Sequence, residues 1–197
     1  QFLVNGNINT TLLTVEDTES PVIIAKEVVI AAGDSCKKED FIEKVEDATK
    51  TKVKESGLSE YKGEAGIYKI TLTATDIAGN VSEEVTHLYV LDVREKLTVE
   101  LGTTSLPADR FIKSDKTGIK LTYGKKFNIN KALQKSGKYT VPIRALVKKN
   151  EKEIKLTLVV KDTKAPVIKG ARDLTIYIGS PFSYREGVSV TDNQPGG

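Results

Sequence analysis

An apolar segment that ends in a glycine occurs three times along this chain of 197 residues, and it restricts the fold more strongly than any other feature. The copies are residues 28–34 (VVIAAGD), 97–103 (LTVELGT) and 174–180 (LTIYIGS). In the second and third copies apolar residues alternate with other residues, which predicts a strand with one buried face. The copies begin 69 and 77 residues apart, a spacing typical of small domains repeated in tandem.

A second pair of matching segments follows the first two copies. Residues 66–74 (GIYKITLTA) and 137–145 (GKYTVPIRA) both begin with Gly-x-Tyr and place apolar residues on one face of a strand. The sequence DIAGN at 76–80 predicts a hairpin turn, because Asp accepts hydrogen bonds from turn amides while Gly and Asn tolerate positive φ. In the second copy a charged turn at 148–152 takes its place. Pro142 predicts an edge strand or a bulge, because proline has no amide hydrogen to donate to a ladder.

The segments that lead into two of the modules match as well. Residues 17–23 (DTESPVI) and 162–168 (DTKAPVI) share an Asp-Thr-x-x-Pro pattern, and its proline favours an extended chain. By the same match, residues 8–16 are interpreted as the last strand of an upstream module. The third copy has only about half of the expected strands. We therefore predict four parts, which are 1–16 (that terminal strand or a linker), 17–92 (first module), 93–161 (second module) and 162–197 (partial third module).

The least strand-like stretch is 34–62, where we expect one helical turn followed by two strands. Asp34 or Ser35 is the expected cap of that turn, and Phe41 and Ile42 are expected to point inward. The two strands are predicted near Val45 and Val53. The second copy offers residues 107–112 (PADRFI) for the equivalent turn.

Together these motifs resemble the immunoglobulin-like (Ig-like) modules of bacterial surface and secreted proteins. The first copy resembles Ig-like repeats of Gram-positive surface proteins through its Asp-Thr-x-x-Pro pattern, residues 40–42 and the hairpin at 68–80. The third copy is similar to the Ig-like module named after a pesticidal crystal protein. The second copy departs most, because it lacks both the Asp-Thr-x-x-Pro pattern and the DIAGN turn. The resemblance implies an all-β fold of tandem Greek-key sandwiches with about seven strands each, with a short helical turn in the first two copies.

A tyrosine corner fits the same resemblance. Tyr68 stands two residues before Ile70, where Ig sandwiches that carry the corner place a core cysteine, and Val141 holds the equivalent position of the second copy. The chain has one Cys and no Trp, so an intramolecular disulfide is excluded. We therefore expect each module to depend on aliphatic packing.

Residues suited to catalysis are scarce. Cys36 and His87 are the only residues of their types; the first is expected to be a half-buried spectator and the second an exposed strand residue. The acidic pairs 83–84, 40/43 and 46–47 offer carboxylates for glycoside hydrolysis, but no pattern fixes two of them across a cleft. We predict no catalytic residue and no enzyme activity.

Calcium is the one ion that the sequence brings into consideration. Acidic and amide residues occur at the predicted module ends, and Ca²⁺ prefers about 6–8 oxygen ligands. Turn capping explains the same residues without an ion. We predict no cofactor and no metal site, with Ca²⁺ at module junctions as the alternative. A spontaneous Lys–Asn bond inside a module is a further alternative, for which no pairing is evident. The residues considered for calcium are Asp17, Asp47, Asp92, Asp162, Asp192 and Asn193.

These expectations lead to two hypotheses about function. The first is a non-catalytic segment of a bacterial surface protein, extracellular and either secreted or attached to the cell, whose modules form a stalk or adhesion scaffold for an unknown host or matrix protein or glycan. The alternative is an accessory carbohydrate- or protein-binding module of a secreted multidomain enzyme, with Tyr89, Tyr123, Tyr177 and Tyr184 as candidate exposed aromatics. The 30 basic and 27 acidic residues nearly balance, which argues against a nucleic-acid partner. No membrane insertion is expected, and the partial third module suggests self-association.

Overall fold

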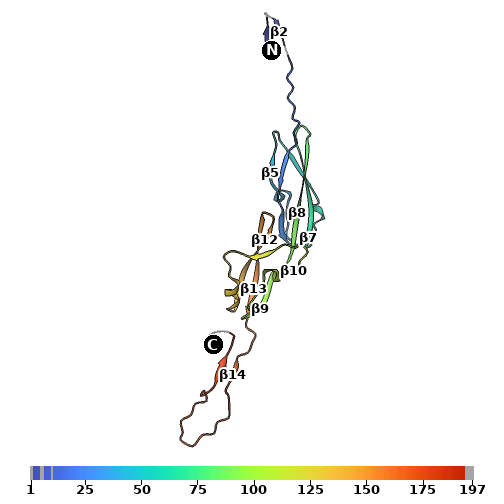
Figure 1. Ribbon diagram of the computed structural model, residues 1–197. Coiled ribbons are helices and arrows are strands. Elements are labelled where there is room, and N and C mark those ends of the chain that lie inside the picture. Colours follow the sequence, from blue (N-terminus) through green and yellow to red (C-terminus); the bar gives the residue numbers. More distant parts are fainter. Residues whose placement is uncertain (1, 5–6, 10, 194–197) are drawn as a thin grey trace. The chain divides into compact units, whose positions relative to one another are not determined.

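The computed structural model describes residues 2–4, 7–9 and 11–193, and most of its regular structure is β-strand (Figure 1). The chain divides into two compact units, residues 1–90 and 91–197. The module boundaries drawn from the sequence stay predictions. No helix within the described ranges has the length and apolar character that crossing a membrane requires. Two short strands near the start, β1 (Phe2–Val4) and β2 (Asn7–Asn9), pair antiparallel.

The first unit contains two sheets. The larger one holds β4, β8, β7 and β6; residues 92–93 at the end of β8, which belong to the second unit, pair with β10 (Ile112–Ser114). A separate antiparallel pair is formed by β3 and β5. The longest strand pairing of the larger sheet is the β7–β8 hairpin, with ten antiparallel residue pairs from Gly66↔Val90 to Thr75↔Val81 (Figure 1). The arrangement is consistent with a β-sandwich. The strands are β3 (Val22–Ala25), β4 (Val28–Ala31), β5 (Ile42–Glu46), β6 (Lys52–Ser56), β7 (Gly66–Thr75) and β8 (Val81–Val93).

Apolar residues from both sheets form the core of this unit. Alternate residues of β7 point into it, and Ile70, Leu72 and Ala74 are fully buried. Strand β3 contributes Ile23, which places the small sheet against the large one. The period-two pattern of residues 66–74 thus identified the buried face correctly, because a strand with one solvated face must alternate. The other buried members of the cluster are Ile30, Phe41, Leu88 and Val90.

The predicted helical turn is present as a 3₁₀ helix, η1 (Lys38–Phe41), and strands β5 and β6 follow where they were expected. Phe41 is fully buried and Ile42 is half-buried. The predicted cap was wrong. The turn begins after Lys37, whose amide donates to Asp40 Oδ2 (2.8 Å), whereas Asp34 Oδ2 accepts from the amide of Ala31 (3.3 Å). An acidic residue inside the turn satisfies the amide that a preceding cap would have served.

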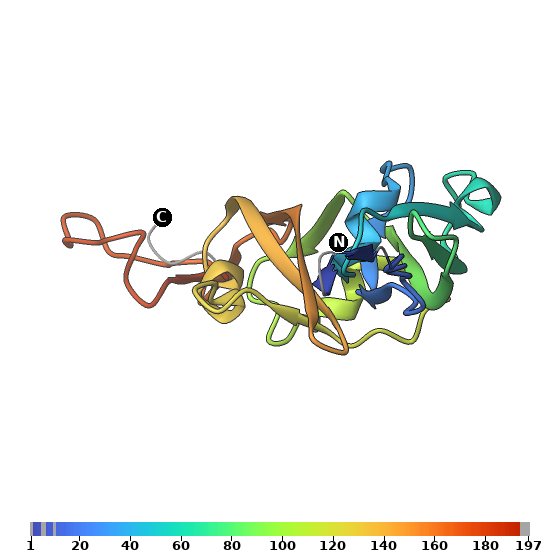
Figure 2. The same ribbon diagram turned by 90° about the horizontal axis from the view of Figure 1, so that it is seen from above.

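The second unit is built on one four-stranded sheet in the order β11-β12-β13-β9. Strands β12 and β13 form an antiparallel hairpin with eleven residue pairs, visible in yellow and orange in Figures 1 and 2. Strand β9 pairs with β13 in parallel. The expected charged turn is shorter than predicted, because β13 already begins at Asn150 and only Lys148 and Lys149 connect the strands. The strands are β9 (Lys96–Glu100), β10 (Ile112–Ser114), β11 (Leu121–Tyr123), β12 (Gly137–Val147) and β13 (Asn150–Lys161).

Short helices contribute much of the layer that covers this sheet. The predicted turn is the 3₁₀ helix η3 (Ala108–Phe111), whose Phe111 is fully buried. The α-helix α1 (Ile129–Leu133) was not predicted; Asn128 caps it by accepting from the amide of Lys131 (3.0 Å). Residues 17–92 hold six strands and residues 93–161 hold five, all within described ranges, against about seven expected for each.

Pro142 lies where β12 loses one of its two neighbours. Strand β11 pairs with Ile143–Ala145 of β12 and ends at Tyr123. The amide of Gly124 then donates to the Pro142 carbonyl (2.8 Å), and no ladder bond is needed from the proline nitrogen. The edge position expected from the sequence is confirmed, and the pairing with β13 runs through Pro142 without a bulge.

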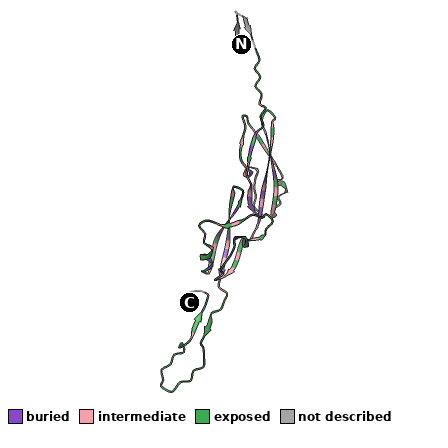
Figure 3. Ribbon diagram, in the orientation of Figure 1, coloured by how far each residue is buried: buried purple, intermediate pink, exposed green. Residues whose placement is uncertain are grey.

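Two predicted strands are absent or much shorter than expected. Of the expected 8–16 strand, residues 8 and 9 belong to β2, residues 11–16 have no regular structure, and residue 10 lies outside the described residues. In the third copy, residues 174–178 form no strand, and Ile178 is fully exposed. Alternating apolar residues are not sufficient for a strand, because its amides and carbonyls also need a neighbouring strand. Figure 3 shows the described part of the stretch after β13 as almost entirely exposed. Among its residues up to 193, the strand pairing is that of β14 (Val167–Lys169) with β15 (Ser189–Thr191).

Candidate functional site

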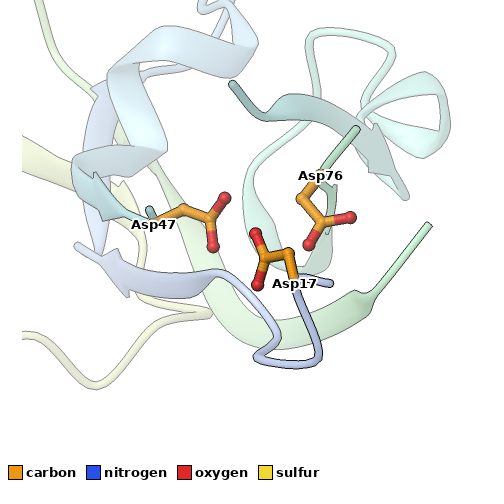
Figure 4. A group of neighbouring side chains, drawn as sticks. All are labelled: Asp17, Asp47 and Asp76. Carbon is orange, nitrogen blue, oxygen red and sulfur yellow. The ribbon is translucent and has the colours of Figure 1, made fainter. Parts of the chain in front are cut away.

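Three carboxylates from distant parts of the first unit lie together. Asp17 precedes β3, Asp47 follows β5, and Asp76 opens the turn between β7 and β8. One oxygen of each lies within 4.8 Å of the others, and Figure 4 shows the three side chains pointing toward a common space. The calcium alternative considers Asp17 and Asp47 among six residues at predicted module ends, without indicating that these two meet. It had missed Asp76, which the sequence assigned to turn capping alone.

Asp76 does cap its turn as predicted. Its Oδ1 accepts from the amides of Gly79 (2.6 Å) and Asn80 (2.7 Å), and its Oδ2 accepts from the Asn80 side chain (2.7 Å). Burial of this carboxylate, which is 7% exposed, acts to raise its pKa, but the hydrogen bonds from Asn80, Gly79 and Ala78 outweigh burial and hold the pKa below its ordinary value. The Asn80 side chain also donates to the backbone carbonyl of Asp17 (3.0 Å), which ties the lead-in segment to the hairpin turn.

The other two carboxylates are satisfied to different degrees. Asp47 Oδ2 accepts from the amide (2.9 Å) and hydroxyl (2.8 Å) of Thr49. Asp17 Oδ1 accepts from the amide of Glu19 (3.2 Å), but Asp17 Oδ2 is buried and receives no hydrogen bond from the described residues. A buried carboxylate oxygen without a donor carries a desolvation cost that a bound cation would offset. Converging carboxylate oxygens are the ligands that Ca²⁺ prefers, so the chemistry of this group suits a hard divalent cation.

The remaining residues considered for calcium do not join this group. Asp92 forms an ion pair with Lys113 (3.3 Å). Asp162 and Asp192 accept from the nearby backbone amides of Lys164 (3.1 Å) and Asn193 (2.7 Å). These three residues therefore have the local roles that turn capping and surface pairing predict. The Asn193 side chain donates to Glu100 Oε1 and to the Leu101 carbonyl, both at 3.3 Å.

The surroundings of the single histidine and the single cysteine indicate structural roles rather than catalytic ones. His87 is less exposed than expected, because its Nδ1 lies 3.5 Å from an oxygen of the buried Glu27, which also accepts from the His87 amide (2.9 Å). Cys36 is half-buried as predicted. Burial raises the pKa of its thiol, and the nearby charges of Asp40 and Glu55 raise it further, which disfavours the nucleophilic thiolate.

Residues of the acidic pairs considered for glycoside hydrolysis form hydrogen bonds and ion pairs with neighbouring residues. Glu83 accepts from the Thr73 hydroxyl (3.3 Å), and Glu46 forms an ion pair with Lys44. Asp40 binds the amide that starts η1, and Asp47 belongs to the carboxylate group.

Charge is strongly separated along the chain, and the near-balance of the whole sequence hides it. Residues 17–92 hold 9 basic and 16 acidic residues, a formal net charge of −7. Residues 93–161 hold 17 basic and 6 acidic residues, a formal net charge of +11. Counting charge for each predicted module, rather than for the chain, would have found this separation from sequence alone.

The basic unit carries a groove on the solvent side of its sheet. A cavity of about 590 Å³ lies over β12 and β13 beside the loop that follows β11. A smaller cavity of about 290 Å³ adjoins it and shares two of its lining residues, Arg144 and Glu151. We call the two cavities together the β12 groove. Its basic side chains are Lys120, Lys125, Lys126, Arg144 and Lys155.

An ion pair stands in the middle of the β12 groove. The Arg144 guanidinium donates to both carboxylate oxygens of Glu151, a bidentate geometry that fixes both side chains. The bonds from Arg144 hold the pKa of Glu151 below its ordinary value. At the floor of the groove Gly124 is buried, and a Cβ there would lie 2.8 Å from the Pro142 ring. Glycine at this position therefore lets the loop lie directly on β12.

Comparisons with known proteins bring in only distant structural likenesses. No protein-family model and no curated protein sequence matches the chain. An endo-fucoidan hydrolase of glycoside hydrolase family 107 is 13% identical over 77% of this chain and 30% of its own, with a TM-score of 0.25. The protocadherin GammaB4 extracellular domain is 12% identical over 91% of this chain and 39% of its own, with a TM-score of 0.23. Extracellular cadherin domains 1–4 of protocadherin Gamma B7 are 17% identical over 90% of this chain and 60% of their own, with a TM-score of 0.22.

This chain therefore spans less than two thirds of the length of each of these proteins. TM-scores this low carry no argument about the activity, ligands or partners of this chain.

Proposed function

We propose that this chain is a non-catalytic segment of an extracellular bacterial surface protein, in which tandem Ig-like modules act as a load-bearing stalk or adhesion scaffold. The observation that carries the proposal is the parallel pairing of β9 with β13 in the second unit. Strand β9 opens the module predicted at 93–161 and β13 closes it, with five residue pairs from Lys96↔Thr157 to Glu100↔Lys161. Tension at the two ends of the module pulls parallel neighbours in opposite directions, so the pairs share the load instead of separating one by one.

Features shared by the two units support the tandem arrangement. The Tyr68 hydroxyl donates to the Glu64 carbonyl (3.0 Å), and the Tyr139 hydroxyl donates to the Lys135 carbonyl (2.7 Å). Both bonds reach four residues back along the chain, and each tyrosine lies near the start of a long hairpin strand, as in the tyrosine corner of Ig sandwiches. Each unit also buries one phenylalanine from a 3₁₀ helix, Phe41 and Phe111.

Pulling the whole chain in two geometries tests the load-bearing role. In a Cys36→Ser background, handles on Lys96→Cys and Lys161→Cys load the β9–β13 pairs in shear. Handles on Lys96→Cys and Thr157→Cys load one register pair at its end and unzip the same strands. We expect a rupture force several-fold higher in shear, because about five pairs are loaded together. Equal forces in the two geometries, measured by single-molecule force spectroscopy, would contradict the proposal.

A divalent cation at Asp17, Asp47 and Asp76 fits the same stalk. Such an ion would bind the lead-in segment to β5 and to the β7–β8 turn, and so stiffen the start of the first module. The buried Asp17 Oδ2 without a donor is the observation that favours it over turn capping alone. With a dissociation constant of about 10⁻⁴–10⁻³ M, roughly 5 mM Ca²⁺ would stabilise the fold by about 1–2 kcal/mol.

Calcium titration followed by thermal unfolding measures this effect. We expect Ca²⁺ to raise the melting temperature of the chain, and Asp17→Asn to abolish the rise without lowering stability in chelator, since the substitution also removes like-charge repulsion. Asp162→Asn is the matched control, because Asp162 accepts from the amide two residues on, as Asp17 does, but lies outside the group. An unchanged melting temperature, together with no heat in calorimetric titration, would exclude the ion.

The alternative function is an accessory carbohydrate- or protein-binding module of a secreted enzyme. Of the four tyrosines considered for it, Tyr177 and Tyr184 are exposed (87% and 79%), whereas Tyr89 and Tyr123 are half-buried. The β12 groove is the observation that favours binding, and its chemistry narrows the class of ligand.

A further inference from the structure

We infer that the β12 groove binds a linear acidic polysaccharide, one that carries carboxylate or sulfate groups along its length. The inference does not depend on the load-bearing role, since a stalk without a ligand and a ligand-binding unit that bears no load are both conceivable. It rests on the charge of the second unit, on the shape of the groove and on the kinds of groups that line it.

The charge favours a polyanion. The module predicted at 93–161 carries a formal net charge of +11. Three lysines of the groove, Lys125, Lys126 and Lys155, are exposed, and none of the ion pairs found among the described residues involves them. Lysines on both sides of the Arg144–Glu151 pair can contact successive anionic groups of one polymer. Electrostatic attraction between these lysines and a polyanion acts at long range and weakens with added salt.

The floor of the groove favours a sugar chain over other polyanions. The Pro142 ring and the half-buried Phe127 give it an apolar surface that suits the C–H faces of sugar rings. The two adjoining cavities run across neighbouring strands, which gives a linear chain an open path.

The acidic residues of the groove favour a polysaccharide over a nucleic acid as the ligand. Glu151 and Glu153 line the larger cavity with the basic residues. Their carboxylates can accept hydrogen bonds from hydroxyl groups, which sugars present on every ring. They repel the closely spaced phosphates of a nucleic-acid backbone more strongly than the sparser anionic groups of an acidic polysaccharide. The basic residues of the module are mostly lysine, with arginine only at positions 94, 110 and 144. Readers of nucleic acid use arginine for bidentate contacts to bases and phosphates, so this lining is a poor fit for DNA.

Binding of defined polymers to the whole chain tests the inference. The probes are polygalacturonate, which carries carboxylates, and chondroitin sulfate, which carries both anions, with neutral dextran as the uncharged reference. In about 50 mM salt we expect at least one acidic polymer to bind and dextran not to bind, with affinity falling as salt increases. The two acidic probes distinguish carboxylate from sulfate recognition.

Two triple variants with equal loss of charge locate the site. Lys125→Ala, Lys126→Ala and Lys155→Ala together remove the groove lysines and are expected to weaken binding at least about tenfold, on the order of 0.5 kcal/mol for each exposed contact. Lys131→Ala, Lys135→Ala and Lys161→Ala remove three exposed lysines outside the groove and are expected to weaken binding less than about twofold. Thermal unfolding of both variants confirms that each is folded, since all six side chains are exposed.

Three results would overturn the inference. Equal losses in the two triple variants would show diffuse attraction without a site. Tighter binding of double-stranded DNA than of either acidic polysaccharide would assign the surface to nucleic acid. Self-association in low salt that the groove variant abolishes, without polysaccharide binding, would instead assign it to the acidic residues of a second copy.

Discussion

Phe41→Ala is expected to lower the free energy of unfolding of the first unit by about 3–5 kcal/mol. The side chain is fully buried at the end of η1 and packs with residues of both sheets. Its removal leaves a cavity between the layers, and neither disulfide nor tryptophan compensates for the loss. Phe111→Ala is expected to have the same effect on the second unit, where Phe111 ends η3 and is also fully buried.

Urea denaturation of the full chain measures both effects. We expect Phe41→Ala and Phe111→Ala to shift two different transitions, one for each unit. Glu39→Ala and Arg110→Ala are the controls, since both residues are exposed in the same 3₁₀ helices and should change stability by less than about 0.5 kcal/mol. If either substitution lowered the free energy of unfolding by less than about 1 kcal/mol, that phenylalanine would not belong to the core. A shift of one common transition by both substitutions would contradict independent modules.

The second large effect is expected at a glycine that touches a neighbouring strand. Gly57 precedes the 3₁₀ helix η2 (Leu58–Glu60) with a φ of 99°, and a Cβ there would lie 2.2 Å from the backbone carbonyl oxygen of Lys69 in β7. Gly57→Ala therefore combines the left-handed strain of an L-residue, about 1–2 kcal/mol, with overpacking of about 1–3 kcal/mol. We expect a total loss of roughly 3–4 kcal/mol.

Gly33→Ala is the matched control for this prediction. Gly33 has a similar φ of 89°, but a Cβ there would meet no atom within 4 Å. Only the left-handed strain remains, so we expect a loss of about 1–2 kcal/mol. Thermal or urea unfolding separates the two variants. Equal losses would mean that η2 moves away from β7 without cost, and that the close approach does not stabilise this unit.

The elements that sequence analysis identified correctly are those specified by neighbouring residues. The β7–β8 hairpin was predicted because its alternation and its DIAGN turn lie within one short stretch, and both features are local. Helix α1 was missed because five residues are too few to show a helical period, although Asn128 is a recognisable cap. Residues 174–178 were wrongly predicted as a strand because alternation says nothing about whether a partner strand exists.

The candidate sites were harder to predict for a similar reason. Asp17, Asp47 and Asp76 come from three segments, and the sequence gives the turn chemistry of each but not their convergence. Sequence analysis considered Asp17 and Asp47 among six residues at predicted module ends, but did not indicate that these two meet. The β12 groove depends on Gly124, which is an ordinary loop glycine in the sequence and becomes informative only when Pro142 is found against it.

The parallel pairing of β9 with β13 also has a consequence for how the second unit forms. Lys96 and Thr157 are neighbours in the sheet but lie 61 residues apart in the chain. During synthesis β9 emerges long before its partner, and the hairpin of β12 and β13 can close first because its contacts are local. Capture of β9 then becomes the late, entropically costly step, and until it occurs the β13 edge is open to the wrong strand.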